Sequence, residues 1–294
     1  MSYPWAANTA DATHIIEPIG QIVAHQQSAT QRNLPDEDAR SLVFDDTNLF
    51  DDSKFSGYDR TETGTRANVG LQYTFQSNDA GYARFLAGES FQLAGENIYA
   101  VNPGIDSDGN LLYSPVSGLQ TARSDFVLGA YIAPAQSFRL ISQSRFDETD
   151  LSLRREDASA QVNYGPFTSQ VTYAFTAADP SILLPSPANP AILVPLDQQD
   201  ILASAMLRLT DRWSVGGGIR YDIQAGEVRQ DSVQLKYSDE CFVLTATYQE
   251  LLYNSVTIND DRSVMLRFEL KHLGNFEAKT STQDFAFGGD QRTN

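Results

Sequence analysis

Apolar and polar residues alternate with a period of two along most of this chain. Such alternation is typical of β-strands that have one apolar and one polar face. The clearest apolar stripes, each interleaved with polar or small residues, are Ala67, Val69, Leu71, Tyr73 and Phe75; Trp213, Val215, Ile219, Tyr221 and Ile223; and Val264, Leu266, Phe268 and Leu270. Helical periodicity is weak everywhere, so the sequence predicts a protein made almost entirely of strands.

The pattern predicts about twelve long strands, each well above the usual strand length of about five or six residues. Tight turns connect some of them, and long segments near 26–61, 95–121 and 180–198 connect others. Short turns that alternate with long loops are typical of outer-membrane β-barrels. The predicted strands are 14–25, 62–76, 81–94, 122–134, 137–148, 151–164, 167–178, 199–211, 213–225, 228–239, 242–254 and 261–272.

The alternation alone fits a soluble sheet as well as a membrane barrel, because both have one apolar and one polar face. Strand length favours the barrel, since a tilted membrane strand needs about 9–11 residues. Aromatic residues near predicted strand ends, such as Tyr73, Tyr164, Phe167 and Trp213, are typical of interfacial girdles. We therefore expect an all-β fold, an antiparallel transmembrane β-barrel segment over residues 1–276, followed by a C-terminal tail over 277–294.

Composition narrows the function classes. The net charge is −17 and the pI is near 4.4. A nucleic-acid-binding protein would carry a basic stripe, which this acidic chain lacks. No nucleic acid is therefore expected as a partner. The sequence contains no run of about twenty apolar residues, so it predicts no transmembrane helix. The first eight residues lack the pattern of a secretory signal, which leaves a cytoplasmic protein and a piece of a longer exported precursor both open.

Few segments suggest binding chemistry. Residues 106–110 resemble part of a calcium loop but lack its other ligands, so an ordinary turn is expected. The acidic groups 36–38, 45–46 and 51–52 are interpreted as solvated loop charge, with weak divalent-cation binding as the alternative. The proline-rich segment 180–196 is incompatible with a helix or a central strand. Glu17-Pro18 is expected to interrupt the first strand and leave it weakly paired on one side.

Enzymatic motifs are missing from the sequence. It contains no G-x-S-x-G, H-E-x-x-H or C-x-x-C pattern, and its three histidines lie far apart. Its one cysteine, Cys241, follows Asp239 and Glu240, which would raise its thiol pKa and reduce its reactivity. We therefore expect no enzyme activity, no cofactor, no catalytic residues and no metal site.

Two stretches resemble a known family. The segment Asn48-Leu49-Phe50, then Phe55 to Arg60, then Glu62, Gly64 and Arg66, resembles the signature of the lipopolysaccharide (LPS) assembly family LptD, also called organic solvent tolerance protein. The stretch from Leu235 to Phe242, followed by Phe268 to Lys271 and Leu273-Gly274, resembles it too, and Ile16-Glu17-Pro18 looks like the family's proline-bearing strand. The family motif residues are Asp59, Arg60, Glu62, Gly64 and Arg66.

The resemblance implies a fold and a function. Members form a barrel of about twenty-six strands. A periplasmic jellyroll domain precedes the barrel in the chain, and a plug lipoprotein, LptE, lies inside the barrel. The chain would be roughly half of that barrel, its C-terminal part, and would insert LPS into the outer leaflet of the cell outer membrane through a lateral opening. Expected partners are LPS, an LptE-like plug, the periplasmic Lpt bridge reached through a jellyroll outside this chain, and the outer membrane.

The same resemblance assigns roles to individual residues. Val264, Leu266, Phe268 and Leu270 would lie on a lateral-gate strand facing lipid, and Arg220, Asp222, Arg267, Glu269 and Lys271 would face the lumen. Many members have two adjacent cysteines near here, where this chain has Glu240-Cys241, so one disulfide from Cys241 to a cysteine outside the chain is implied. A passive porin-like barrel and a soluble β-rich binding protein remain the alternatives.

Overall fold

The fold is known from a computed structural model, which describes residues 1–26, 42–59, 61–100, 117–178, 184–185, 193–252, 260–271 and 274–281. For 184–185, 193 and 274–281 the backbone alone is described. All regular elements in these ranges are strands. No helix within them is long and apolar enough to cross a membrane.

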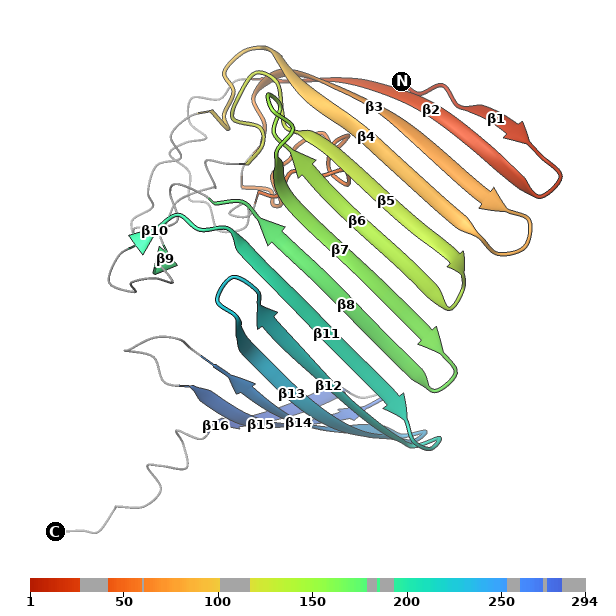
Figure 1. The fold of residues 1–294 in the computed structure, drawn as a ribbon, viewed down its shortest axis with the longest axis vertical. Coiled ribbons are helices and arrows are strands. Elements are labelled where there is room, and N and C mark those ends of the chain that lie inside the picture. Colours follow the sequence, from red (N-terminus) through yellow and green to blue (C-terminus); the bar gives the residue numbers. More distant parts are fainter. Residues whose placement is uncertain are drawn as a thin grey trace. The chain divides into compact units, whose positions relative to one another are not determined.

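Fourteen strands follow one another in a hydrogen-bonded order that matches their order in the chain, and the pairs of known register are antiparallel (Figure 1). They are β1 (Trp5–Asn8), β2 (Ala12–His25), β3 (Gly64–Ser77), β4 (Tyr82–Ala94), β5 (Phe126–Ala135), β6 (Phe138–Phe146), β7 (Leu153–Tyr164), β8 (Phe167–Thr176), β11 (Gln198–Arg208), β12 (Trp213–Asp222), β13 (Glu227–Ser238), β14 (Phe242–Leu251), β15 (Asp261–Leu270) and β16 (Gly274–Ser281). A separate pair is formed by β9 (Leu184–Pro185) and β10 (Leu193–Val194).

The prediction of an all-β antiparallel fold is confirmed. Each of the twelve predicted strands is present, and the largest difference in a strand end is four residues, at the start of β5 (126 against 122). The sequence pattern missed β1, β9, β10 and β16 because each is short or lacks a clear stripe. β16 continues to Ser281, past the expected start of the tail at 277, and the domain division stays a prediction.

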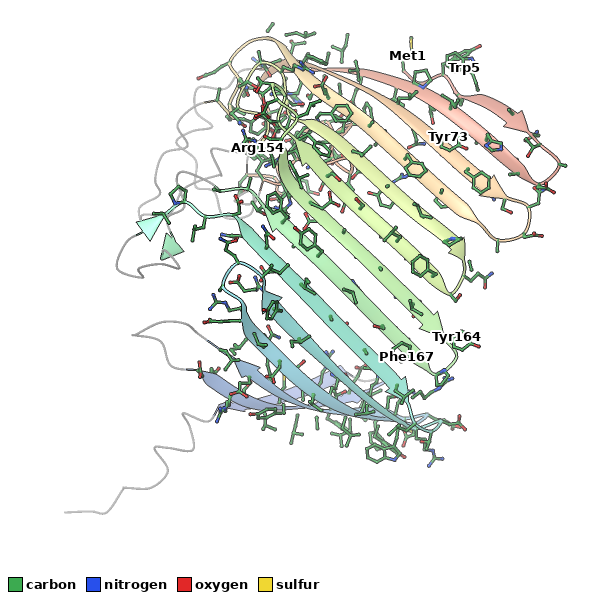
Figure 2. All side chains as sticks on the ribbon, in the orientation of Figure 1. Met1, Trp5, Tyr73, Arg154, Tyr164 and Phe167 are labelled. Carbon is green, nitrogen blue, oxygen red and sulfur yellow. The ribbon has the colours of Figure 1, made fainter. Side chains whose placement is uncertain are left out.

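The chain forms two compact units. The first comprises Met1–Ala158 and Phe175–Gln198, and the second comprises Ser159–Ala174 and Gln199–Asn294. In the first unit, one face of β3–β5 is apolar and open, with Val69 and Leu71 half exposed. The other face is covered by the chain's own connecting segments. Figure 2 shows Tyr73 on β3 of the first unit, and Tyr164 and Phe167 flanking the β7–β8 turn in the second.

Pro18 does not interrupt its strand, contrary to the sequence-based prediction. β2 runs continuously from Ala12 to His25, and Pro18 pairs with Leu71 of β3. The Pro18 carbonyl accepts a hydrogen bond from the Tyr3 backbone N–H at 3.3 Å. In an antiparallel ladder the N–H and C=O of one residue point to the same neighbour, so the donor that proline lacks is missing on the β1 side. The β2–β3 ladder is unaffected, because the missing N–H would not point to β3.

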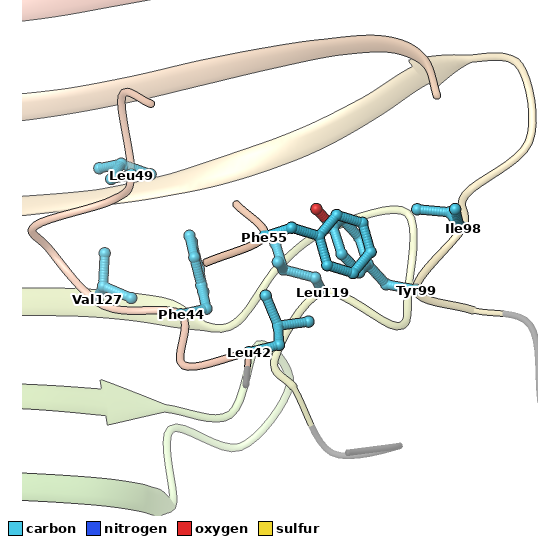
Figure 3. Close-up of a cluster of buried hydrophobic side chains, with 8 residues drawn as sticks. All are labelled: Leu42, Phe44, Leu49, Phe55, Ile98, Tyr99, Leu119 and Val127. Carbon is cyan, nitrogen blue, oxygen red and sulfur yellow. The ribbon is translucent and has the colours of Figure 1, made fainter. Parts of the chain in front are cut away.

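A hydrophobic cluster lies on the covered face of the first unit (Figure 3). Its members come from the segment 42–59, from the connection after β4 and from the start of β5. They are Leu42, Phe44, Leu49, Phe55, Ile98, Tyr99, Leu119 and Val127. This cluster is the buried core of the described chain, and it fixes the segment 42–59 against the sheet.

Candidate functional site

The family-motif residues form a buried ion pair where the segment 42–63 enters β3. Arg66 Nε lies 3.1 Å from Glu62 Oε1, and both side chains are about 5% exposed or less. Arg66 also donates to Asn97 Oδ1 at 3.3 Å, and its guanidinium lies 5.5 Å from the Tyr99 ring centroid. The motif therefore ties the start of β3 to the connection that follows β4.

Gly64 is required by its backbone. Its φ is +83°, and a β-carbon there would collide with the Ala94 carbonyl oxygen. Only glycine adopts such a conformation without strain. Asp59 is half buried, and Arg60 lies outside the described residues. Three of the five motif residues thus have a visible structural role.

Two ionisable groups are buried beside the same ion pair. The Lys54 ammonium donates to the Asp51 carbonyl at 2.7 Å, and burial lowers the pKa of Lys54. Burial, and next the negative charge of Glu62, raise the pKa of the Tyr99 hydroxyl well above its ordinary value. The raised pKa opposes ionisation of the Tyr99 hydroxyl, and the lowered pKa opposes protonation of the Lys54 amine. Burial is the main cause of both shifts, so this cluster is a buried structural contact.

Glycines on three neighbouring strands make room for the segment 42–59. A β-carbon on Gly70 would lie 2.9 Å from Phe50 Cζ, and one on Gly88 would lie 2.5 Å from Leu49 Cδ2. At Gly129 a β-carbon would overlap the Asp46 carboxylate. The segment therefore lies directly on the backbone of β3, β4 and β5, a contact that larger residues would prevent.

Polar contacts hold the same segment. Asp46 is 3% exposed and accepts hydrogen bonds from Tyr131 Oη at 2.8 Å and Gln143 Nε2 at 2.9 Å. At the other end, Gln21 Nε2 donates to the Phe50 carbonyl at 2.9 Å, and His25 Nε2 lies 2.8 Å from the Asp52 carbonyl. The segment thus connects β2 to β6 across the covered face. The interpretation of 45–46 as solvated loop charge is wrong for Asp46, whose carboxylate is buried; residues 36–38 lie outside the described part.

An acidic group that the sequence analysis missed lies where β5 begins and β6 ends. Carboxylate oxygens of Asp125, Asp147 and Glu148 lie within 4.8 Å of one another. Arg145 Nε is 3.2 Å from Asp125, and Arg154 is 2.6 Å from Asp147. Burial raises the pKa of Asp125 to about 7, against the attraction of Arg145, while hydrogen bonds from Thr149 and then Arg154 hold the pKa of Asp147 below its usual range. Two arginines therefore compensate this group.

In the second unit, residues expected to face the lumen and residues expected to face lipid lie on opposite faces. Leu266 and Phe268 pair with Ala246 and Leu244, and all four lie on the apolar face. On the other face Arg220 contacts Asp200 at 2.8 Å, Asp222 contacts Arg229 at 2.9 Å, and Arg267 lies 4.0 Å from Glu269. Val264, Leu266 and Leu270 are between 37% and 50% exposed.

The surroundings of β15 and Cys241 bear on the predicted gate and disulfide. β15 is paired on both sides, with β14 and with β16. The Lys271 ammonium donates to the Asp239 carbonyl in the turn between β13 and β14. Cys241 in that turn is exposed and free in this chain. The calcium-like stretch 106–110 and most of the proline-rich segment lie outside the described residues.

Comparison with known proteins adds the identity of the family. The family model "LptD: LPS transport system D" matches residues 1–186. LPS-assembly proteins LptD are similar: that of Francisella tularensis subsp. novicida is 22% identical over 82% of this chain and 30% of its own length, that of Aeromonas salmonicida 24% over 90% and 31%, and that of Saccharophagus degradans 24% over 83% and 28%. The chain thus spans about a third of the length of these relatives. A mutant Rh. blastica porin aligns with a TM-score of 0.36 and 9% identity, over 92% of this chain and 85% of the porin.

These matches decide several predictions. The resemblance carried by the motifs around Glu62 and Leu235 is confirmed at the level of the family. The family model and these relatives are named for LPS transport and LPS assembly, so the predictions of no enzyme activity and of an outer-membrane location are confirmed at the level of the family. The family match covers more than half of the 294 residues, and the chain belongs to the LptD family of the LPS transport system.

Proposed function

We propose that this chain forms part of an outer-membrane β-barrel that inserts LPS into the outer leaflet through a lateral opening. The observation that carries the proposal is the family match over residues 1–186. The two-faced strands support it, because an apolar face suits lipid and a charged face suits a wet lumen. Since the relatives are about three times as long, the remaining parts of the translocon lie outside these 294 residues.

A lateral opening has a physical reason. A closed barrel wall is a complete hydrogen-bonded ladder, which an amphipathic glycolipid does not cross. Opening a seam between two strands lets the sugar leave through the lumen while the acyl chains enter lipid. Within the described sheet, β1 and β16 are the end strands and β15 lies next to β16. We place the seam at an end of this sheet, with Val264, Leu266, Phe268 and Leu270 of β15 facing lipid beside it.

The remaining roles follow the family. Arg220, Asp222, Arg267, Glu269 and Lys271 would face the lumen and an LptE-like plug lipoprotein. LPS would arrive from the periplasmic Lpt bridge through a jellyroll domain outside this chain. Cys241, exposed in its turn, would form a disulfide with a cysteine of that periplasmic part.

Two experiments test the proposal. Depleting the full-length protein should reduce surface LPS, whereas depletion of a passive porin would leave surface LPS unchanged. A cysteine pair that joins the two seam strands should leave assembly intact and block LPS export. Restoration of export on reduction is the control. Normal surface LPS in cells whose seam is demonstrably cross-linked would contradict the lateral route while leaving the barrel fold unaffected.

A further inference from the structure

Two rows of side chains cross the apolar face of β13–β15 in the second unit, and the first row continues onto β12. The row nearest the tight turns is aromatic. Ring centroids are 5.0 Å apart for Trp213 and Tyr237, 5.5 Å for Tyr237 and Phe242, and 5.4 Å for Phe242 and Phe268. Aromatic rows of this kind lie at the membrane interface of β-barrels.

The second row lies toward the opposite ends of the strands and is charged. Asp231 pairs with Glu250, and Glu250 pairs with Arg262, so all three lie on the same face as Tyr248 and Val264. Arg262 Nε lies 2.6 Å from Glu250 Oε1, and the Arg262 side chain is 54% exposed. Charged groups on a lipid-facing surface are tolerated near the interface and disfavoured at the bilayer midplane.

The distance between the two rows is short for a membrane band. On β14 the charged Glu250 follows the aromatic Phe242 by eight residues, with Leu244, Ala246 and Tyr248 between them on the same face. At ~3.3 Å per residue these eight residues span ~26 Å along the strand. A tilt of ~40° reduces this to ~20 Å along the membrane normal, against an ordinary apolar band of ~25 Å.

The first unit provides an internal comparison. On β3 the outward positions from Phe75 to Thr65 carry no charge over ten residues, and the β2 residues that pair with them, from His14 to Ala24, include no Asp, Glu, Lys or Arg on the same face. Ten residues at the same rise and tilt span ~25 Å, the ordinary band. On the following strand, outward Glu89 pairs with Arg123 at 2.6 Å, so the uncharged band of full height belongs to β2 and β3.

We infer that the apolar face of β13–β15 borders a bilayer that is thinner than the one bordered by β2 and β3. This inference rests on the proposed membrane function. A strand whose apolar stretch is too short draws the bilayer down to its own length, since exposing hydrocarbon to Glu250 and Arg262 is more unfavourable than local thinning. The occupant of this face is therefore phospholipid or LPS acyl chain, with headgroups at the level of Asp231, Glu250 and Arg262.

The test measures depth at matched positions in the full-length protein. An environment-sensitive fluorescent amino acid is placed, one position at a time, at Ala67, Ala246 or Glu250, and the protein is reconstituted in phosphatidylcholine vesicles. Ala67 and Glu250 both lie eight residues from their aromatic row. Lipids brominated near the headgroup end of the acyl chain should quench the label at 67 strongly and the label at 250 several-fold less, and lipids brominated near the bilayer centre should quench the label at 246, which lies midway between the two rows.

Each outcome has a distinct meaning. Equal quenching at 67 and 250, with 246 also quenched, would overturn the thinning while leaving the membrane function standing. No quenching at 246 by any lipid would overturn both, because a second copy of the chain or another protein would then cover the face.

A paired variant gives an independent check. Glu250→Leu with Arg262→Leu lengthens the apolar band, so a label at Tyr248 should move deeper and be quenched more strongly by bromines near the bilayer centre. The matched control changes the opposite face, with Thr245→Leu and Arg267→Leu at another cross-strand pair. An unchanged Tyr248 depth in the first variant, or an equal change in both, would overturn the inference.

Discussion

The carboxylate of Asp46 occupies the place where a side chain at Gly129 would begin. A β-carbon at Gly129 would overlap the carboxylate, which is held there by Tyr131 and Gln143. Eighty-three positions separate the two residues in the chain. The Asp46 carboxylate can therefore be buried there only because Gly129 has no side chain. The position of the segment 42–59 depends on this contact.

Gly129→Ala should displace the segment 42–59 from the sheet. Overpacking a close contact costs about 1–3 kcal/mol, and here the atom displaced is a hydrogen-bonded carboxylate. Limited proteolysis of the full-length protein should show faster cleavage between 42 and 59. Gly20→Ala is the control, because a β-carbon at Gly20 meets nothing within 4 Å. Equal protease resistance in wild type and Gly129→Ala would contradict the role assigned to this contact.

Arg66→Met should destabilise the protein far more than the loss of one surface ion pair. It leaves the Glu62 carboxylate buried without a cation, which costs about 3–5 kcal/mol. Adding Glu62→Leu should recover most of the loss, because two apolar residues leave no buried charge. Heat-induced unfolding in detergent of both single variants and the double variant checks this. Additive effects of the two changes would show that the side chains do not act as a pair.

Asp125 should make stability fall as the pH rises. Its pKa in the folded protein, about 7, is above its ordinary value of 3.8, so the folded state holds a proton that the unfolded state has released. The contribution is fully present below about pH 4 and is lost as the pH rises through about 7. The midpoint of thermal unfolding, compared between wild type and Asp125→Asn, should show a smaller pH slope in the variant. Asp147→Asn is the contrast. Because the pKa of Asp147 is held low, its carboxylate stays ionised from about pH 4 to about pH 7, and the loss of stability in this variant should not change with pH over that range.

Leu266→Arg should impair barrel assembly much more than Arg267→Leu. The first change puts a charge on the apolar face of β15, at a cost of about 2–4 kcal/mol near the bilayer midplane, while the second removes a charge from the opposite face. Heat-modifiable migration of the full-length protein from outer-membrane fractions measures the folded share. Similar assembly of the two variants would argue against lipid contact at Leu266.

The local pattern of this sequence determines its strands. A period of two needs only neighbouring residues, so Trp213 to Ile223 or Val264 to Leu270 predict both a strand and its two faces without knowledge of any partner. The tight turns and the lack of catalytic motifs are equally local. The family motif can also be recognised from the sequence, because the combination of Glu62, Gly64 and Arg66 is unusual.

Only the tertiary structure decided what the long connections do. Asp46 looks like loop charge in the sequence, because its burial depends on Gly129, Tyr131 and Gln143, which are far away in the chain. The same holds for the pairing of Glu62 with Arg66 beneath Tyr99 and for the acidic group around Asp125. Pro18 predicts that one backbone N–H donor is missing from its strand. That the donor is missing on the β1 side, and not on the β3 side, follows only from the pairing in the structure. Alternation is a property of one strand, whereas burial and pairing are properties of the partners that a strand or segment meets.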